Sequence, residues 1–450
     1  MVGLCNGNKA LGGQKLGVFR PSSVAGSPIR CCSDAVPAPG WMSVRRFRAR
    51  SFLVATAMVV GLRPGVGFAQ SVNVGEELME VREPEEPALN IHPWQWLRHQ
   101  WLDEMATLDR LVGLQAGVSF TTIYQHAAGL PSPNNASVAN LDLFGRWKLL
   151  DLGPLGTSTV GYLFRNRSVW TALNGNELSD SIGLPWGINN SGSSSYTRLN
   201  QLWWQQSMLD DSLRLQFGRL DEKALFDQNR VAASDAKQFL MQSLVHSQTI
   251  AFPSNGMGFN LRWEPSKAFY ATAGFGDANG NPDNRAADGV ASFGRGKYFE
   301  AAEVGWSPDI PGLERGTYRF MGWHTAATNQ HKEGSGVALS VDQEIGDGIV
   351  PFLRLGYCPD DVFQTSVEVS WGVATVRPFD RATDLAGIGA TWGRPVPTST
   401  RDQFAMDLFY RLQVVEGIQI SPDVELVFAP ALQPGRSFVA VFGLRSRIAL

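Results

Sequence analysis

The residues of this chain best suited to acid–base chemistry are six histidines, and none of them stands in a catalytic arrangement. No HExxH, G-x-S-x-G or P-loop motif occurs, and no serine lies at an informative spacing from His324. Segment 277–288, "DANGNPDNRAAD", lacks the ordered ligand positions of a calcium loop and is typical of a turn. The sequence therefore predicts no catalytic residue, no metal site and no cofactor. A hydrolase whose groups meet only in the fold stays open as an alternative.

Arginines, amides and carboxylates offer the other chemistry, which is the reversible binding of polar solutes. They alternate with apolar residues in "LRLQFG" (213–218), "MGFNLRWE" (257–264) and "FAMDLFYRL" (404–412). In "FQTSVEVSWGVATV" (363–376), Glu368 stands on the polar side, and Val369 and Trp371 stand on the apolar side. This period-two alternation predicts β-strands that have one apolar and one polar face.

Sixteen segments after residue 113 are candidate strands. Long connections alternate with short ones such as "DLGP", "DDS", "EPSK" and "GDGI". Long loops at one end and short turns at the other are typical of an outer-membrane barrel. The candidate strands are 114–125, 138–149, 156–167, 196–208, 212–219, 257–264, 268–277, 297–306, 316–324, 336–345, 350–358, 362–375, 385–393, 402–413, 417–428 and 437–449.

A secretory signal peptide is predicted over residues 42–69. It combines the basic "MSVRRFRAR", the short apolar "FLVATAMVVGL", and Gly67 and Ala69 at the spacing of a cleavage site. Residues 1–41 show no coherent pattern, so we expect them to be non-structural or to lie upstream of a true start at Met42. Only one cysteine follows residue 69, which excludes a disulfide within the remaining chain.

The chain after the signal peptide is acidic, with 30 Lys and Arg against 41 Asp and Glu, a net charge of −11. This balance disfavours a nucleic-acid partner. Residues 70–91 are expected to form an acidic flexible leader. Residues 92–113 space apolar side chains on one face and predict a short amphipathic helix that ends at a glycine.

Two architectures could hold the strands: a soluble sandwich, or a transmembrane antiparallel β-barrel of about 16 strands. No run of about eighteen apolar residues occurs, so a spanning helix is not expected. The signal peptide, the strand number and the alternating connections favour an all-β barrel over residues 114–450, with polar faces around a water-filled lumen. An arginine at Val369 should then cost roughly 2–4 kcal/mol, whereas Glu368→Gln should alter permeation alone.

The side chains predicted to face inward carry both charges. A lumen of one sign would select ions, whereas a mixed lumen suits neutral solutes such as sugars, whose hydroxyls accept from arginine and donate to carboxylates. Loop 220–256 either folds into the lumen or packs on the rim. A plugged structural or adhesive barrel and, less favoured, a membrane-embedded hydrolase are the alternatives to a channel. The inward set comprises Arg146, Lys148, Arg214, Asn260, Arg262, Glu303, Arg319, Arg354, Glu368, Asp407, Arg411 and Glu425.

From about residue 93 onward the chain resembles the carbohydrate-selective porins of the OprB family. The segments that carry the resemblance are "RLNQLWWQQSMLDDSLRLQFGRLDEKALFD" (198–227), "PFLRLGY" (351–357), "DLAGIGATWG" (384–393) and "RDQFAMDLFYRLQVVEGIQISPDVELVFAP" (401–430). The resemblance implies a sixteen-stranded barrel of the bacterial outer membrane with short N-terminal helical structure. It also implies diffusion of glucose or related sugars through a channel that inward loops constrict and that arginines and acids line.

The resemblance also implies site residues and partners. Asp407 stands where the family pattern usually has glutamate, which retains the charge but shortens its reach. The chain ends in Leu450, whereas such barrels commonly end in phenylalanine. The expected partners are small sugars, the lipid bilayer and the outer-membrane assembly machinery, and the expected state is a monomer or a loose oligomer. Carried onto matching positions, the implied channel residues are Arg198, Trp204, Arg214, Arg219, Arg354 and Asp407.

Overall fold

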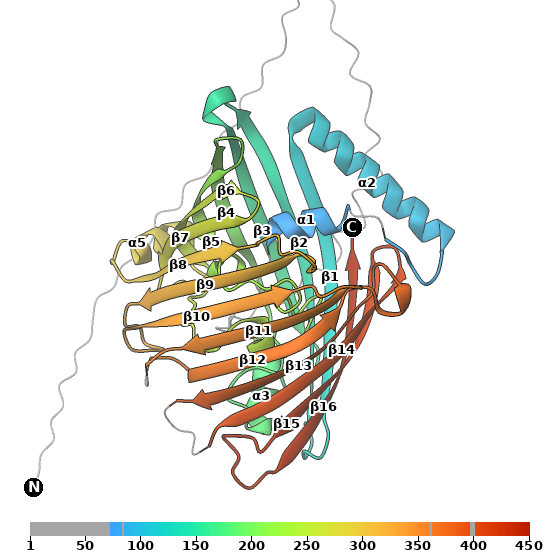
Figure 1. Cartoon of the computed structure of the whole chain (residues 1–450), viewed down its shortest axis with the longest axis vertical. Helices are drawn as coiled ribbons and strands as arrows, with labels where there is room; N and C mark the ends of the chain where they lie inside the picture. The colour runs from blue at the N-terminus through green and yellow to red at the C-terminus, as the bar shows by residue number, and fades with distance from the viewer. Residues whose placement is uncertain (1–72, 83–84, 360–361, 397–400) are drawn as a thin grey trace, which may run out of the picture. The chain divides into compact units, whose positions relative to one another are not determined.

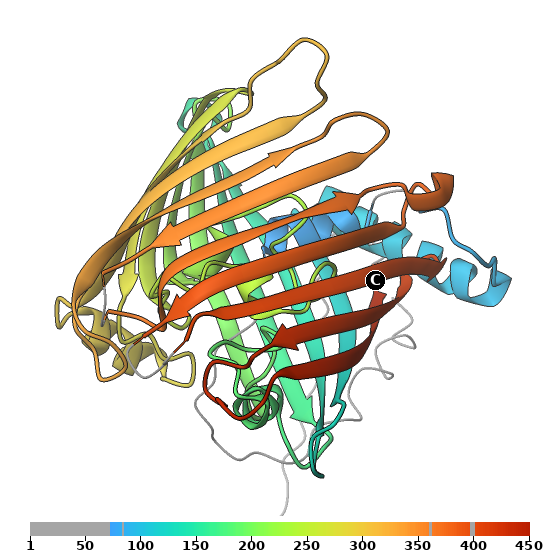
Figure 2. The same cartoon turned by 60° about the horizontal axis from the view of Figure 1, so that its bottom comes forward.

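The computed structural model describes residues 73–82, 85–359, 362–396 and 401–450. The predicted signal peptide and the segment before it lie outside the described residues. The described strands form one closed antiparallel sheet in which each strand pairs with its neighbours in sequence and β1 pairs with β16 (Figure 1). The predicted sixteen-stranded all-β barrel is therefore confirmed. In Figure 2 the orange and red strands form the front of the barrel, with the green and blue strands behind.

The strand bounds lie within a few residues of those predicted from the alternation. They are β1 Leu114–Ala127, β2 Asn135–Asp151, β3 Thr157–Val169, β4 Tyr196–Met208, β5 Leu213–Leu220, β6 Gly256–Ser266, β7 Phe269–Asp277, β8 Tyr298–Trp306, β9 Gly316–Thr325, β10 Gly334–Gln343, β11 Ile349–Tyr357, β12 Thr365–Thr375, β13 Leu385–Pro395, β14 Gln403–Val415, β15 Ile418–Phe428 and β16 Phe438–Ala449.

Short helices precede the barrel and interrupt its connections. None of those in the described residues is long and apolar enough to cross a membrane. Helix α2 matches the predicted amphipathic helix and ends at Gly113, whose φ of 71° is the left-handed conformation common at helix ends. The helices are α1 Val74–Glu80, α2 His92–Val112, α3 Gly175–Ile182, α4 Gln242–Val245 and α5 Ala286–Phe293, with 3₁₀ turns η1 Gly153–Leu155, η2 Glu222–Ala224 and η3 Pro378–Asp380.

The alternation of β12 separates its two faces as predicted. Glu368 is 1% exposed and faces the interior, whereas Trp371 is 41% exposed on the outside. The same division recurs around the barrel, where Phe217, Trp263 and Leu408 are exposed on the outer face. In a membrane this apolar outer face contacts hydrocarbon, and closure of the sheet pairs backbone groups that would otherwise be costly there.

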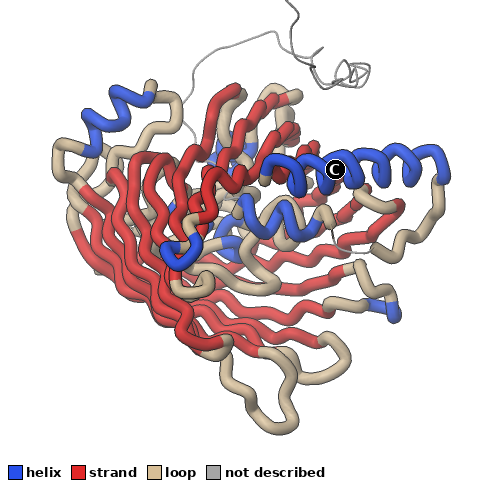
Figure 3. The backbone as a smooth tube through the Cα atoms, turned by 90° about the horizontal axis from the view of Figure 1, so that it is seen from above, coloured by secondary structure: helices blue, strands red, loops and turns tan. Residues whose placement is uncertain are grey.

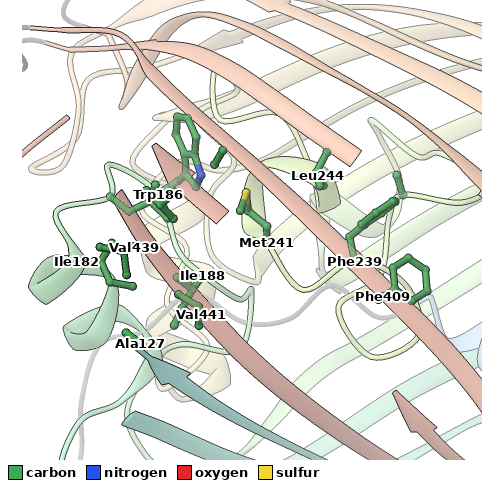
Figure 4. Close-up of a cluster of buried hydrophobic side chains, with 14 of the residues drawn as sticks. Ala127, Ile182, Trp186, Ile188, Phe239, Met241, Leu244, Phe409, Val439 and Val441 are labelled. Carbon is green, nitrogen blue, oxygen red and sulfur yellow. The ribbon is translucent and has the colours of Figure 1, made fainter. Parts of the chain in front are cut away.

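Two long connections enter the barrel instead of packing on its rim. Segments 170–195, between β3 and β4, and 221–255, between β5 and β6, carry many buried side chains. Viewed from above in Figure 3, loops and short helices lie in the space that the strands enclose. Their apolar residues form a cluster with the inner wall, in which the Phe239 ring meets the Phe409 ring of β14 edge-on at 4.8 Å (Figure 4).

Helix α1 lies in the segment that the sequence predicts to be a flexible leader, so the structure differs from that expectation over residues 74–80. Asn73 caps the helix, because its side-chain oxygen accepts from the backbone N–H of Gly75 at 3.0 Å. Val74 and Leu78 are buried in a cluster with Trp203 of the inner barrel wall. Apolar burial and a cap stabilise this helix although its sequence is acidic.

Candidate channel and its lining

The largest cavity described here, about 850 Å³, lies inside the barrel against the inner faces of β4–β9. Alternate residues at one end of several of these strands contribute to it, such as Arg214 and Gln216 of β5, which places part of the polar face around solvent-accessible space. Segment 73–79 borders one side of the cavity, and residues 224–228 border another. The strand residues in its wall include Trp203, Gln205, Arg214, Gln216, Asn260, Arg262, Glu264, Tyr270, Thr272, Glu303 and Arg319.

Two arginines stand directly opposite each other in this wall. Arg214 of β5 and Arg262 of β6 are cross-strand partners, an arrangement in which like charges repel. Glu264 offsets the repulsion because its carboxylate pairs with both guanidinium groups, with Arg262 Nε at 2.6 Å. The Arg262 guanidinium also lies 3.8 Å from the centre of the Tyr270 ring. Pairing and stacking therefore hold Arg262 in a defined position in the cavity wall.

Hydrogen bonds accepted by Glu303 join the cavity wall to the inward loop, which is the connection 221–255. The Glu303 carboxylate accepts from the Tyr270 hydroxyl at 2.7 Å and from the backbone N–H of Asp227 at 2.9 Å. On the neighbouring strands, Arg319 donates to Asp342 at 2.6 Å. The contacts of Glu303 hold the inward loop at Asp227 against β7 and β8. The barrel wall therefore positions the part of the loop that borders the cavity.

Helix α1 is tied to the inward loop and to β16. Lys237 of the loop pairs with Glu77 at 2.9 Å and also with Glu80, and Arg447 pairs with Glu77. Burial alone would lower the pKa of Lys237, but the two carboxylates raise it above its ordinary value. Helix α1 thus occupies part of the interior and narrows the space beside the cavity.

A short stretch of the inward loop separates the cavities along the interior. A second cavity of about 330 Å³ shares lining residues with the large cavity. A third cavity of about 260 Å³ is lined mainly by the connections 170–195 and 221–255. Lys223 borders the third cavity, while its neighbour Ala224 borders the other two. The chain around η2 therefore lies between the third cavity and the other two, and we call it the partition.

Glu222 packs within this partition against two glycines of the wall. A Cβ added at Gly258 or Gly276 would lie 2.8 or 2.5 Å from its Oε1 atom, so a larger residue at this cross-strand pair would require the Glu222 carboxylate to shift. Burial raises the pKa of Glu222 to about 8, and neighbouring Asp221 adds to the shift. The partition thus contains an acid that changes charge near neutral pH.

On the opposite side of the interior, inward side chains contact protein instead of a cavity. Arg354 of β11 is 1% exposed and donates to the backbone carbonyl of Asp227 at 2.8 Å. The side-chain carboxylate of Asp227 lies 3.8 Å from the Arg354 guanidinium. Glu368 accepts from the backbone N–H of Gln248 at 2.9 Å. Both predicted residues therefore hold the inward loop, and Glu368 does not face open water.

Asp407 and Glu425 repeat this arrangement on β14 and β15. Asp407 is fully buried and accepts from the backbone N–H groups of Leu240 and Met241 at 3.0 and 2.9 Å. Glu425 is fully buried and accepts from the side chain of Gln125. Their inward direction agrees with the alternation, but their partners are the loop and the wall.

Six of the residues predicted to face inward meet in the large cavity, namely Arg146, Arg214, Asn260, Arg262, Glu303 and Arg319. Trp204 does not join them. It is 37% exposed on the outer face, opposite Phe217, whereas adjacent Trp203 is 7% exposed and lines the cavity. The choice of Trp204 is therefore corrected to Trp203. Trp203 shares its strand face with Gln201 and Gln205, so the alternation itself could have identified it.

Lys148, Arg198, Arg219 and Arg411 lie away from the cavities described. Lys148 is exposed near the end of β2 and pairs with Asp151 at 2.9 Å. Arg198 pairs with Asp283 at 3.0 Å, and Arg219 donates to backbone carbonyls of the same connection, so both hold segment 278–297. Arg411 is half-buried and donates to the Thr383 carbonyl at 3.3 Å. Their roles are structural contacts at the rims and the inner wall.

Several cavity residues were not selected from the sequence. The cavity also contains Gln205, Gln216 and Tyr270, each of which shares a strand face with a neighbouring polar residue. That alternation indicates their inward direction. Glu76 of α1 also lines the cavity, and no pattern in an acidic leader could place it there. The interior contribution of α1 depends entirely on tertiary contacts.

A closed sixteen-stranded barrel with an apolar outer face and polar cavities inside defines the porin class of outer-membrane proteins. The family model "Carbohydrate-selective porin, OprB family" matches residues 167–330 and 324–450. The chain belongs to this family. It is a bacterial outer-membrane porin and not an enzyme, so the expected class and location are confirmed.

Similar proteins and structures agree with this membership. Porin AaxA of Chlamydia abortus is 22% identical over 312 residues, covering 67% of each chain. Porin AaxA of Chlamydia pneumoniae is 23% identical over 317 residues, covering 68% of this chain and 70% of that one. The high-pH structure of Pseudomonas putida OprB superposes with a TM-score of 0.65 at 16% identity, covering 82% of this chain and 99% of that one. The structural likeness supports the fold.

Proposed function

We propose that this porin lets monosaccharides and other small neutral carbohydrates cross the outer membrane by passive diffusion. The observation that carries the proposal is the wall of the large cavity. There Arg262 lies over the Tyr270 ring, with Asn260 and Gln216 on the same inner face. Guanidinium and amide groups donate to sugar hydroxyls, and amide oxygens accept from them. Cavities that combine aromatic surface with a few placed polar groups are typical ligand sites.

The positions of the cavities support a route along the barrel interior. The cavity near the long connections and the large cavity lie on opposite sides of η2. Long loops face the cell exterior in outer-membrane barrels and short turns face the periplasm. A sugar would therefore enter beside α3, pass the partition, and leave past α1.

Purified protein in planar bilayers and in liposomes tests this function. If solutes pass the chain around η2 between the cavities, we expect stepwise conductance and equilibration of labelled glucose. Trp203→Leu should change the glucose flux, whereas the matched outward variant Trp204→Leu should not. Equal effects of the two variants would contradict the proposed lining.

The plugged structural or adhesive barrel is the second candidate, because segments 170–195 and 221–255 occupy much of the interior. A plugged barrel would show neither conductance at any voltage nor sugar flux in a folded preparation. That result would exclude the channel and favour this candidate.

A further inference from the structure

The wall of the large cavity holds more cations than carboxylates. This excess stands in a chain whose net charge is −3. Clefts lined mainly by one sign of charge focus the electrostatic field and concentrate ions of the opposite sign. The cations are Arg146, Arg214, Arg262, Lys267, Arg315 and Arg319, and the carboxylates are Glu76, Glu264 and Glu303.

Ion pairing within the wall leaves part of this positive charge unneutralised. Glu264 is shared between Arg214 and Arg262, so one carboxylate serves two guanidinium groups. Within the described part of the chain, neither Arg146 nor Arg315 has a carboxylate within ion-pair distance. Arg146 instead donates to the side-chain oxygen of Gln115 at 3.3 Å.

The available groups match a solute that carries one anionic group and several hydroxyls. Planar guanidinium groups bind carboxylates and phosphates through two parallel hydrogen bonds. Asn260 and Gln216 lie in the same wall, and their amide groups can serve the hydroxyls. A neutral sugar would use only the second set of groups.

We propose that this cavity makes the channel favour monosaccharides bearing a carboxylate or a phosphate over neutral monosaccharides. The proposal rests on the proposed function as a sugar channel and names its preferred substrate class. The shared chemistry is an anionic group on a polyol, and the two possible anionic groups are separate arms of the test.

The test measures efflux of labelled glucuronate, glucose 6-phosphate and glucose from liposomes containing the full porin. We expect both anionic sugars to leave faster than glucose in about 0.1 M salt, where charges act over about 10 Å. In bilayers with a KCl gradient, the reversal potential should show chloride to be more permeant than potassium. Both preferences should shrink in about 1 M salt, where screening is stronger.

Variants connect the preference to the cavity. Arg262→Gln and the double variant Arg214→Gln with Arg262→Gln should lower the ratio of glucuronate to glucose efflux toward one. Lys148→Gln is the matched control, because it removes a cation that is exposed and paired outside the cavities described. It should leave the ratio unchanged. The single variant Arg262→Gln serves if the double variant does not fold.

The outcomes separate this inference from the function on which it rests. Faster efflux of one anionic sugar alone supports the proposal and identifies the anionic group. Glucose efflux equal to or faster than both anionic sugars overturns the preference and leaves the sugar channel standing. A ratio that the arginine variants do not change also overturns it. No efflux of any sugar contradicts the proposed function itself.

Discussion

The two sides of the barrel interior use the same strand pattern for different purposes. On β4–β9, inward residues such as Arg262 and Asn260 line a cavity of about 850 Å³. On β11–β15, inward residues such as Arg354 and Asp407 are buried against the loop 221–255. An inward direction therefore does not specify whether a side chain borders a cavity or packs against protein.

The physical reason lies in the needs of buried polar groups. A polar atom removed from water must find a hydrogen-bond partner, or its burial costs free energy. On the packed side, Glu368 and Asp407 accept from backbone N–H groups of the loop, which gives those buried N–H groups acceptors. On the open side, solvent-accessible space allows Arg146 to remain without a carboxylate. Substitutions should therefore affect stability on one side and permeation on the other.

The largest effect is expected on the packed side, for Arg354→Leu. This change leaves the carboxylate of Asp227 buried without its cation, and breaking such a pair costs about 3–5 kcal/mol. Urea-induced unfolding in detergent micelles measures the loss. Arg146→Leu on the open side is the matched control and should cost less than about 1 kcal/mol. Similar losses for the two variants would remove the distinction between the sides.

The next effect compares adjacent residues of β12. Val369→Arg places a charge against lipid and should cost roughly 2–4 kcal/mol. Glu368→Gln alters the acceptor of the Gln248 N–H and should cost about 1 kcal/mol, because one buried hydrogen bond is weakened without a change of shape. Because Glu368 holds the inward loop, we predict this loss of stability in addition to the change in permeation expected from the alternation. Unfolding in lipid vesicles measures both changes, and the reverse order would contradict the assignment of faces.

The partition between the cavities should make stability depend on pH. Glu222 has an ordinary pKa of 4.5 that burial raises to about 8, so the folded state favours its neutral form. The resulting stabilisation is present below the ordinary value and is lost as pH rises through the folded value. The urea concentration at the unfolding midpoint should fall as the pH rises from about 5 to about 9. In Glu222→Gln this midpoint should depend less on pH, because the titrating carboxyl is absent. An unchanged curve in the variant would exclude Glu222 as a source.

The smallest stability effect is expected for Gln216→Leu on the open side. The Gln216 side-chain amide donates a hydrogen bond to the Gln205 side-chain oxygen at 2.9 Å beside the cavity. Substitutions at such solvated positions usually change the free energy of unfolding by less than about 0.5 kcal/mol. Glucose efflux should nevertheless decrease, because the cavity loses an amide that can serve hydroxyls. Phe217→Leu, on the adjacent outward position, controls for the change in the strand. A large loss of stability from Gln216→Leu would show that this wall is also packed.

Part of the site could be read from the strands alone. The alternation of "LRLQFG" and "MGFNLRWE" identified Arg214, Asn260 and Arg262, and the face shared with Gln205 could have selected Trp203 over Trp204. The inward turn of loop 221–255 could not be read in this way. Its direction depends on contacts with residues far away in sequence, among them Asp407 and Arg354.

The pattern of the sequence was enough to predict a sixteen-stranded barrel and the inner and outer faces of most of its strands. It could do so because the pleat reverses side-chain direction at every residue and closure of the sheet follows from strand number and patterning. The tertiary structure alone decided which inward residues border a cavity and which are buried. It also turned an acidic leader into helix α1, because Val74 and Leu78 find an apolar surface inside the barrel and Glu77 finds Arg447. Such partners are distant in sequence, and only the closed barrel brings them together.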